Sequence, residues 1–597
     1  MESSEEELSW TSKIIDSVLS IKGYAVEGVA EGGLIVFSAR EDSGRSLWVM
    51  GKSNGDKVKL VEGYIGYVRA SPRSHWILYS LDISHGRESS SLVALNVVTR
   101  EKVVIEGFGM ARVTGIAWDG SKAGVTVSTD RGFELRIVDS SSWVVEDVYR
   151  TDRPIFASDM DNGVLVGTGH LAGDPRSTEL FLYYLGESRF VDYTPLRGST
   201  NKKPKIRSNS VLFINSMVRD EILVLDVKSM TSRPPSLKYN DYKLMTLAEL
   251  LDLGWTSEGK IWFIGKSMGR AFLYIDGRKI KTPQGTIING FTNNGDLILT
   301  YTSFNKPPSI LIVKRGKSES KFLLEPKLKE PLPLKDKPRL EWIESSDGVR
   351  VPVWVLESKM SSRPGPTIIY IHGGPWSEVS DEWRPIVSSM LYAGFNVVIP
   401  NYRGSTGYGE HYRRLIIGDP GGGDVEDVIS TASWARKAGL ASSIIALGYS
   451  YGGYLTLMAM SKAPELFDGG VAGAAITDWR EAYELSDALF KRFIEILFNG
   501  KGYLMEERSP VNHVEMVKAP LCIIHPLNDT RTPLAPVLKY ALQLQIRGKM
   551  FEIHIIPGVG HVLDDNKSLR RLLLHTLLFL KTVELPPRHV VEEVIEA

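Results

Sequence analysis

The chain has 597 residues, of which 43% are hydrophobic and 24% are charged, with 71 basic and 71 acidic side chains. This length is too great for one hydrophobic core and predicts two or more domains, and the composition is that of a folded protein rather than a disordered one. The balanced charge excludes a strongly basic protein that would bind nucleic acid or an anionic membrane through its overall charge.

Several features predict a soluble, cytoplasmic protein without a disulfide framework. Cys522 is the only cysteine, which fits a reducing compartment. The acidic segment 1–8 lacks the basic start and apolar core of a signal peptide, and no apolar run reaches the roughly 18 residues of a membrane span. Glutamine occurs at only three positions, a scarcity that favours a thermophilic source.

The first segment, residues 1–23, is expected to contain an amphipathic helix. Trp10, Ile14, Val18 and their apolar neighbours recur at helical spacing, and Ser9 is a suitable N-cap. Because a lone amphipathic helix is unstable, this one must pack on a later part of the chain.

Residues 24–324 form the second segment, where short β-rich runs alternate with turns of Gly, Asp, Asn and Ser. A loose repeat of strand, polar turn and apolar strand recurs at 68–79, 115–125, 253–263 and 288–298. Seven units of about 40 residues can be laid out, which is the size of a four-stranded propeller blade. The segment therefore predicts a seven-bladed β-propeller, with a pair of β-sandwiches as the alternative.

The third and fourth segments are a linker and a second domain. Residues 325–338 are rich in proline and lysine, which suits an extended connector. In 339–597, apolar strands such as 367–371, 397–400 and 444–447 alternate with helical segments. Such alternation predicts a mostly parallel sheet covered by helices on both faces, an α/β-hydrolase type of domain.

Ser450 is the predicted nucleophile. It lies at the centre of Gly448–Gly453, which follows the strand 444–447 and precedes an apolar helix. Small residues around a central serine allow the sharp turn that raises its hydroxyl above the sheet. The alternative interpretation is an ordinary tight turn.

A serine hydroxyl needs a base, and in this type of domain an acid and then a histidine follow the serine along the chain. His561 lies in a glycine-rich loop after the strand 551–556, whereas His554 lies within that strand. Asp529 follows the strand 521–525 and would hold the imidazole in the correct tautomer. The alternative role for Asp529 is to cap its loop.

Acyl transfer also needs hydrogen-bond donors for the oxyanion. His372-Gly-Gly-Pro375 follows the strand 367–371, where the first donor loop of this type of domain is expected. The backbone N–H groups of Gly374 and Tyr451 are therefore predicted to form the oxyanion hole. His372 is expected to order the loop rather than to transfer protons.

Taken together, these motifs resemble the prolyl oligopeptidase family of serine peptidases. The resemblance is carried by five segments, namely His372–Pro375, Asn401–Gly409, Gly448–Gly453, His525–Pro533 and Gly560–His561. It covers the C-terminal half closely and the propeller only by architecture. It implies that the N-terminal helix packs on the hydrolase domain, that the propeller caps the active site, and that only short peptides are cleaved.

Within the family, the chain looks closest to the acylaminoacyl peptidase branch, which removes a blocked N-terminal residue and often cleaves esters. Dipeptidyl peptidases bind a free amine with a Glu-Glu pair, and residues 24–324 contain no adjacent glutamates. Arg531 matches the Asp-x-Arg pattern of the family, which implies a contact to a substrate carbonyl. Trp479, Phe490 and Phe493 are predicted to line an apolar specificity pocket, with a role in the core as the alternative for each.

The sequence thus predicts a serine peptidase that releases N-acylated amino acids from short blocked peptides. The alternatives are a carboxylesterase without a peptide role, a dipeptidyl peptidase or oligopeptidase of the same family, and a non-catalytic propeller scaffold. No cofactor or metal is expected, because no His/Cys cluster and no phosphate-binding loop were found. We expect a homo-oligomer of two or more subunits.

Overall fold

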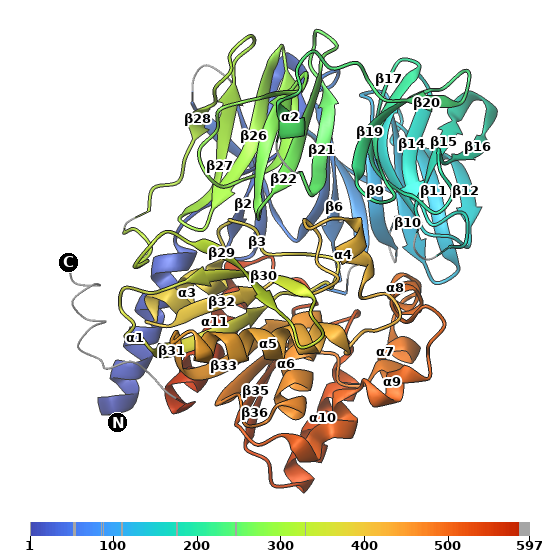
Figure 1. The fold of residues 1–597 in the computed structure, drawn as a ribbon. Helices are drawn as coiled ribbons and strands as arrows, with labels where there is room; N and C mark the ends of the chain where they lie inside the picture. The colour runs from blue at the N-terminus through green and yellow to red at the C-terminus, as the bar shows by residue number, and fades with distance from the viewer. Residues whose placement is uncertain are drawn as a thin grey trace.

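The computed structural model describes residues 2–51, 55–84, 86–87, 89–108, 111–174, 177–244, 247–328 and 330–583. A β-rich domain built from the first half of the chain lies above an α/β domain built from the second half (Figure 1). Residue 1 and residues 584–597, which the predicted first and last segments include, lie outside the described residues.

The N-terminal helix α1 (Glu2–Leu19) lies against the α/β domain (Figure 1). Its buried residues Ile14, Ile15 and Val18 belong to the same apolar cluster as side chains of α3 (Pro385–Tyr392) and α11 (Asn566–Val583). The helix gains its stability from this apolar contact, as its amphipathic pattern requires.

The β-rich domain consists of consecutive four-stranded antiparallel groups, each built from neighbouring segments of the chain. The first strands of successive groups contact one another in a ring, from β1 through β5, β9, β13, β17, β21 and β25 back to β1. Apolar clusters fill the space between adjacent groups, so the second strands of the groups, such as β6, β10 and β22, are buried on both faces. The strands are β1 (Ala25–Ala30), β2 (Leu34–Glu41), β3 (Gly44–Met50), β4 (Lys57–Gly63), β5 (Ile65–Ala70), β6 (Trp76–Asp82), β7 (Ser90–Asn96), β8 (Lys102–Ile105), β9 (Arg112–Trp118), β10 (Lys122–Thr129), β11 (Gly132–Asp139), β12 (Val144–Thr151), β13 (Ile155–Asp161), β14 (Val164–Gly169), β15 (Glu179–Tyr184), β16 (Arg189–Tyr193), β17 (Thr200–Arg207), β18 (Ser210–Ser216), β19 (Asp220–Asp226), β20 (Thr231–Arg233), β21 (Glu249–Trp255), β22 (Ile261–Ser267), β23 (Arg270–Ile275), β24 (Arg278–Lys279), β25 (Thr286–Asn293), β26 (Asp296–Ser303), β27 (Lys306–Val313) and β28 (Lys321–Leu324).

The last two groups, β21–β24 and β25–β28, are joined into one sheet by a parallel pairing of Ala271 with Thr286. The count of seven blades therefore stays a prediction. A short helix, α2 (Asp241–Leu244), precedes β21. The ring closes through side chains, because the Val26 N–H donates to Thr300 Oγ1 at 2.8 Å and the Asn289 side-chain amide donates to the Val26 carbonyl at 3.0 Å.

The α/β domain is built on an eight-stranded sheet of order β29-β30-β32-β31-β33-β34-β35-β36. The pairs β29–β30 and β30–β32 are antiparallel, and the other neighbouring strands run parallel. Helices α1, α3 and α11 cover one face, whereas α5, α6 and α10 cover the other. The strands are β29 (Arg339–Glu344), β30 (Arg350–Leu356), β31 (Gly365–Ile371), β32 (Asn396–Pro400), β33 (Ala441–Tyr449), β34 (Gly469–Gly473), β35 (Leu521–Pro526) and β36 (Phe551–Ile556), and the remaining helices are α4 (Glu410–Arg414), α5 (Gly423–Lys437), α6 (Tyr451–Lys462), α7 (Trp479–Leu485), α8 (Ala488–Phe498), α9 (Leu504–Glu507) and α10 (Leu534–Ile546).

Buried ion pairs join the two domains. Lys266 of β22 pairs with Glu378, which follows β31, and their side chains are only 3% and 8% exposed. Arg270 pairs with Asp381 at 2.9 Å on the same side of the interface. Since both acids lie just beyond the His372–Pro375 segment, the β-rich domain holds this loop in place.

Among the described residues, we find no helix that is both long enough and apolar enough to cross a lipid bilayer.

Candidate active site

Ser450 lies on a strained turn between β33 and α6. Its backbone has φ 60° and ψ −122°, a conformation that residues other than glycine rarely adopt. The turn is possible only with glycines around it: a methyl group on Gly448 would lie 2.2 Å from the Gly452 carbonyl oxygen, and one on Gly452 would lie 2.1 Å from the Ile371 carbonyl oxygen. The motif is thus required by close packing, which presents the serine at the carboxyl end of the sheet.

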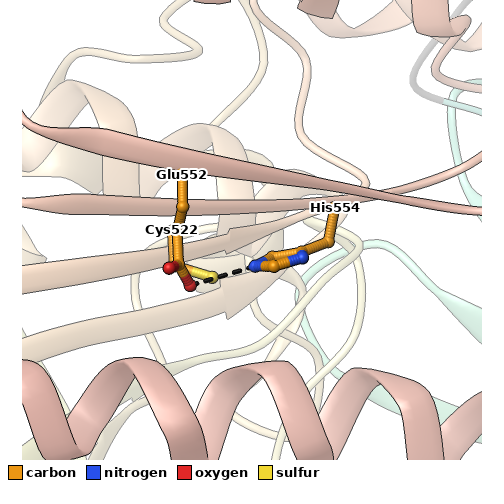
Figure 2. A group of neighbouring side chains, drawn as sticks. All are labelled: Cys522, Glu552 and His554. Atoms are coloured by element: carbon orange, nitrogen blue, oxygen red, sulfur yellow. Dashed lines mark hydrogen bonds and ion pairs between the residues drawn. The ribbon is translucent and has the colours of Figure 1, made fainter.

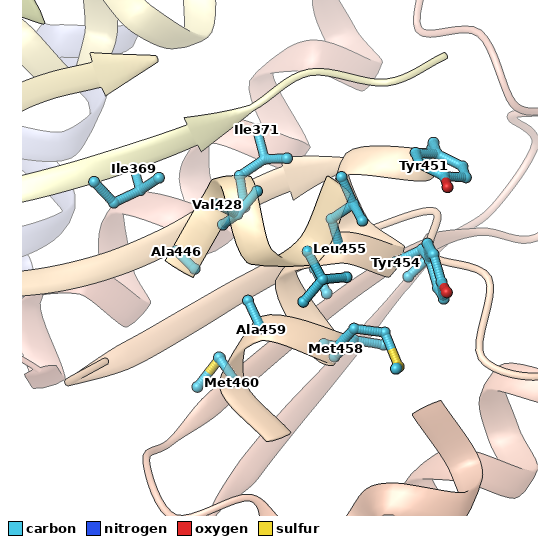
Figure 3. Packing of buried hydrophobic residues seen from close by; sticks show 14 of the residues in the cluster. Ile369, Ile371, Val428, Ala446, Tyr451, Tyr454, Leu455, Met458, Ala459 and Met460 are labelled. Atoms are coloured by element: carbon cyan, nitrogen blue, oxygen red, sulfur yellow. The ribbon is translucent and has the colours of Figure 1, made fainter. Parts of the chain in front are cut away.

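Helix α6 lies behind the serine, and its residues from Tyr451 to Ser461 are all buried. Leu455, Met458 and Ala459 of this helix pack against the strands of the sheet and against Val428 of α5 (Figure 3). A helix held in this way cannot shift without disturbing the core, so the position of Ser450 is fixed by the scaffold.

Ser450, His561 and Asp529 form a continuous hydrogen-bonded chain. Ser450 Oγ lies 2.8 Å from His561 Nε2, and His561 Nδ1 lies 2.7 Å from Asp529 Oδ2. The three residues come from the loops after β33, β35 and β36, so the parallel sheet brings them to one edge. The structure therefore places the predicted nucleophile, base and acid in the order that nucleophilic catalysis requires.

Asp529 is buried and fully hydrogen-bonded. Its Oδ1 accepts from the backbone N–H groups of Arg531 and Thr532, and its Oδ2 accepts from Thr532 Oγ1 at 2.8 Å. Burial raises the pKa of Asp529, but the interactions with His561 and these hydrogen bonds outweigh burial, so the pKa lies below its ordinary value. The carboxylate is therefore ionised and can stabilise an imidazolium on His561.

Tyr449 holds the loop that carries His561. Its phenol donates to the His561 backbone carbonyl at 2.8 Å, and the two rings lie 5.8 Å apart. Neither Tyr449 nor Thr532 was predicted from the sequence as part of the site. Tyr449 directly precedes the nucleophile, and Thr532 follows Asp529 by three positions, a spacing that suits a turn capped by a side chain.

The predicted donors of the oxyanion hole border the serine. Gly373 approaches closest, since a methyl group on it would lie 3.3 Å from Ser450 Cβ, and both Gly373 and Gly374 line the cavity described below. Tyr451 is the first residue of α6, so its backbone N–H lacks an acceptor within the helix. Both predicted N–H groups thus come from segments that border the nucleophile.

His372 is buried and neutral. Burial lowers its pKa to about 3, its Nε2 lies 2.9 Å from Ser405 Oγ, and its ring stacks on Tyr402 with centroids 4.4 Å apart. These contacts fit the expectation that His372 orders the donor loop.

A cavity of about 1100 Å³ lies between the two domains and opens onto Ser450 and His561. The β6–β7 loop closes one side of it, since a methyl group on Gly86 would lie 2.1 Å from the Gly560 backbone nitrogen. Phe490 and Phe493 of α8 line the cavity and stack with centroids 5.0 Å apart. Both predicted pocket aromatics therefore face the space next to the serine.

The prediction that Trp479 lines this pocket is wrong. Its side chain is completely buried in the core, where it packs edge-on against Tyr454 and Phe498. Trp479 begins α7 directly after its N-cap Asp478, and this start directs the indole toward α6 rather than toward the cavity.

Arg531 lines the cavity and belongs to a charged group that spans both domains. Arg112 of β9 donates to Asp487 at 2.8 Å, and Asp487 also caps α8 by accepting from the Phe490 N–H. Burial lowers the pKa of Arg112 to about 10, and the Asp487 carboxylate offsets part of this shift. Arg531 interacts electrostatically with both residues. The β-rich domain thus contributes to the position of the helix that carries Phe490 and Phe493.

A group of metal-ligating side chains lies away from the cavity, on β35 and β36. Cys522, Glu552 and His554 place their donor atoms within 4.8 Å of one another (Figure 2). Thiol, carboxylate and imidazole are donors that zinc accepts in proteins. Here Glu552 Oε1 and His554 Nε2 lie 3.0 Å apart and use their donor atoms on each other. This group was not predicted from the sequence, because Cys522 meets Glu552 and His554 only through the pairing of β35 with β36.

Two family models match this chain. Residues 382–584 match the prolyl oligopeptidase family, and residues 42–311 match the N-terminal domain of acylamino-acid-releasing enzyme-like proteins. Acylamino-acid-releasing enzyme 1 of Oryza sativa subsp. japonica is 29% identical over 238 residues, which cover 37% of this chain and 31% of the rice protein. Dipeptidyl aminopeptidase BIII of Pseudoxanthomonas mexicana is 28% identical over 209 residues, which cover 33% and 30% of the two chains. The chain thus spans about a third of the length of these curated relatives.

Solved structures resemble the whole chain. An acylaminoacyl peptidase of Pyrococcus horikoshii superposes with a TM-score of 0.73 at 17% identity and covers 98% of this chain and 99% of its own. A puromycin-hydrolyzing peptidase of Mycobacterium tuberculosis superposes with a TM-score of 0.78 at 16% identity, with 96% of each chain covered. At these identities the likeness shows the fold alone, and it confirms the predicted architecture of a β-propeller above an α/β-hydrolase domain.

Proposed function

The C-terminal domain of this chain belongs to the prolyl oligopeptidase family, and we propose that the chain is a serine peptidase that releases N-acylated amino acids from short blocked peptides. The observation that carries the proposal is the chain of hydrogen bonds from Asp529 through His561 to Ser450, at the wall of a cavity enclosed between two domains. Such a site supports acyl transfer and limits the size of the substrate.

In the proposed mechanism, Ser450 Oγ attacks the scissile carbonyl while His561 Nε2 takes the hydroxyl proton. Asp529 keeps the proton of Nδ1 in place and stabilises the imidazolium. The N–H groups of Gly374 and Tyr451 stabilise the oxyanion. His561 then gives its proton to the departing amine, which leaves an acyl-enzyme ester on Ser450. A water molecule hydrolyses this ester by the reverse use of the same groups.

A neutral acyl group on the substrate amine suits the charges that face the cavity. Glu27 pairs with Arg45, and Asp82 accepts from the N–H groups of Ser84 and Gly86. These carboxylates are therefore already engaged, and a substrate ammonium would be buried at a cost in free energy. We propose that Phe490 and Phe493 favour an apolar side chain on the acylated residue and that Arg531, which lines the same cavity, binds a substrate carbonyl.

The enclosure of the site supports a limit to short peptides. The contact between Gly86 and Gly560 brings the propeller directly onto the loop of His561. A folded protein cannot enter a space of about 1100 Å³ without separation of the domains. The same triad would also cleave simple esters of N-acylated amino acids, and we propose this as a side activity.

We further propose a cytoplasmic location and a homo-oligomer. Cys522, the single cysteine, is buried and forms no disulfide, which supports a reducing compartment. Leu538, Leu542 and Ile546 form an exposed apolar stripe on α10, a feature typical of surfaces that associate. Light scattering coupled to size exclusion would measure the number of subunits.

A substrate panel tests the proposed activity. N-acetyl-aminoacyl p-nitroanilides, free aminoacyl p-nitroanilides, N-acetyl peptides and p-nitrophenyl esters would be compared by kcat/KM. The peptidase proposal requires turnover of the acylated amides. Cleavage of esters without cleavage of any amide would instead identify a carboxylesterase.

A further inference from the structure

We propose that Arg40 forms a subsite for a carboxylate on the leaving-group side of the scissile bond, so that the protein selects short blocked peptides with a free C-terminal carboxylate. This inference rests on the proposed peptidase function and specifies which peptides the cavity accepts.

Arg40 is a charged side chain that faces the cavity without a bonded partner. It lies at the end of β2 and lines the cavity between the domains. Among the residues that the structure describes, none forms a hydrogen bond or an ion pair with its guanidinium. Burial lowers the pKa of Arg40, and the charges of Asp564 and Asp565 offset this only in part. A half-buried guanidinium that lines a cavity with no hydrogen bond of its own offers its donors to an anionic ligand.

Most of the other arginines that line the cavity already have partners. Arg112 pairs with Asp487, Arg384 with Glu382 and Arg492 with Glu495, while Arg69 Nε donates to the Ile116 carbonyl at 2.8 Å. Arg40 differs from these four because none of its guanidinium nitrogens forms a hydrogen bond or an ion pair with a described residue. A guanidinium binds a carboxylate through two parallel hydrogen bonds, a geometry that a single charge on lysine cannot reproduce.

The position of Arg40 indicates which part of the substrate it would meet. His561 must hand its proton to the departing amine, so the leaving group lies on the His561 side of Ser450. The loop that follows His561 lines the cavity as far as Asp564, whose charge acts on Arg40. The same region is tied to the β2–β3 hairpin, since Asn566 Nδ2 lies 3.5 Å from Asp42 Oδ1. Arg40 therefore stands beside the path of the leaving peptide.

The overall charge of the cavity favours an anionic group there. Among the described residues that line it, six are arginines and three are acids. Two of these acids, Glu27 and Asp82, are engaged in the bonds described above. The free C-terminus of a short peptide supplies the required carboxylate, whereas an internal segment of a longer chain does not.

Matched pairs of peptides test this subsite. Acetyl-Phe-Ala, acetyl-Phe-Ala-Ala and acetyl-Phe-Ala-Ala-Ala would each be made with a C-terminal carboxylate and with a carboxamide. At the length that reaches Arg40, we expect the wild type to prefer the carboxylate by about tenfold to a hundredfold in kcat/KM. Arg40→Gln should reduce this ratio to near one, and Arg40→Lys should retain part of it. Neither variant should change the turnover of acetyl-Phe p-nitroanilide, which has no carboxylate, by more than about twofold.

Arg492→Gln is the matched control, because it removes the same charge from the cavity wall at a guanidinium that is already paired. It should keep the preference for the carboxylate. Equal turnover of acid and amide at every length, or an equal loss of preference in Arg40→Gln and Arg492→Gln, would overturn the subsite. If acetyl-Phe p-nitroanilide and the peptides are all left uncleaved by the wild type, the peptidase proposal fails and the subsite fails with it. If circular dichroism shows that Arg40→Gln does not fold, Arg40→Met replaces it in the comparison. A folded Arg40→Met that prefers the carboxylate over the carboxamide peptide as strongly as the wild type would contradict the subsite.

Discussion

The phenol of Tyr451 donates a 2.6 Å hydrogen bond to Asp424 Oδ2, and both side chains are completely buried behind Ser450. Because the backbone N–H of Tyr451 is a proposed oxyanion donor, Asp424 acts as a positioning residue for this end of α6. Asp424 itself lies in the first turn of α5, so the contact ties the two helices together beneath the site.

Asp424 should make the stability of the protein depend on pH. Burial raises its pKa from 3.8 to about 6, so the folded state is favoured while the group is protonated and loses stability as the pH rises through this range. The shift corresponds to about 3 kcal/mol above pH 6. We expect Asp424→Asn to unfold at a higher denaturant concentration than the wild type at pH 8, with a smaller difference at pH 4. The exposed Asp152→Asn is the control, and a variant that is destabilised equally at both pH values would contradict the ionisation cost.

Ser450→Ala should abolish turnover without unfolding the protein. The hydroxyl bonds only to His561 in the structure described, so its loss removes little packing. We expect about 10⁻³ or less of the wild-type kcat with an unchanged Tm. Ser442→Ala, at an exposed position of the same strand β33, should keep full activity. A purified Ser450→Ala protein with a third of the wild-type rate would reject this residue as the nucleophile.

Asp529→Asn should lose three to four orders of magnitude in kcat, because the amide permits the wrong tautomer of His561. Thr532→Val removes the 2.8 Å bond to Asp529 Oδ2 and the longer 3.3 Å contact with His561 Nδ1, and it should cost about tenfold or less in kcat. The low pKa of Asp529 also has a consequence for stability. The ionised group stabilises the folded state above its unfolded pKa near 3.8, and this contribution is lost as the pH falls through the folded value. Acid unfolding of the two variants, followed by circular dichroism, should show a weaker loss of stability as the pH falls below 3.8 in Asp529→Asn than in Thr532→Val.

The buried pair of Lys266 and Glu378 should matter for stability mainly when it is broken. The intact pair adds little to the free energy of unfolding, but removal of one partner leaves the other charge buried and unpaired. Glu378→Gln leaves a buried ammonium that keeps its 2.7 Å hydrogen bond to Ser380 Oγ but loses its carboxylate partner. We therefore expect the free energy of unfolding to fall by about 3–5 kcal/mol. The double variant Lys266→Met with Glu378→Leu removes both charges and should recover most of this loss. Glu465→Gln, in the exposed pair with Lys518, should change stability by less than about 0.5 kcal/mol. Urea unfolding measures the free energy of unfolding of each variant. A double variant as unstable as Glu378→Gln alone would show that the unpaired charge of Lys266 is not the cause of the loss.

Much of the site could be predicted because its signals are local. The turn of Ser450 needs glycines at fixed offsets, and the loops of Asp529 and His561 each follow a recognisable strand. Parallel strands bring their carboxyl ends to one edge, so the order of strands along the chain already implied that the three residues could meet.

The rest depends on contacts between distant segments. Arg112 and Asp487 are 375 positions apart and meet only after the domains dock, so no local pattern marks them. Trp479 could not be assigned from the sequence for a similar reason. An apolar residue at the start of a helix can line a pocket or lie in the core, and the core position of Trp479 is evident only from its contacts with Tyr454 and Phe498.

The proposed preference for a blocked substrate rests on the charges in the cavity. A free ammonium buried beside Ser450 would need a carboxylate, but Glu27 is paired with Arg45, Asp82 holds the loop of Gly86, and the charge of Asp564 acts on Arg40. We expect acetyl-Phe p-nitroanilide to be cleaved about 150-fold better in kcat/KM than Phe p-nitroanilide, which corresponds to about 3 kcal/mol.

Arg45→Gln removes the partner of Glu27, so the Glu27 carboxylate becomes available to a substrate ammonium in the cavity. This variant should gain turnover of the free-amine substrate relative to the acetylated one, since Glu27 would become available to the ammonium. The exposed Arg100→Gln serves as the control for loss of one positive charge elsewhere on the propeller. Equal kcat/KM for acetylated and free-amine substrates in the wild type would mean that a carboxylate already serves as an anchor. Asp564, which lines the cavity near His561, is the first candidate, and Asp564→Asn should in that case destroy only the free-amine activity.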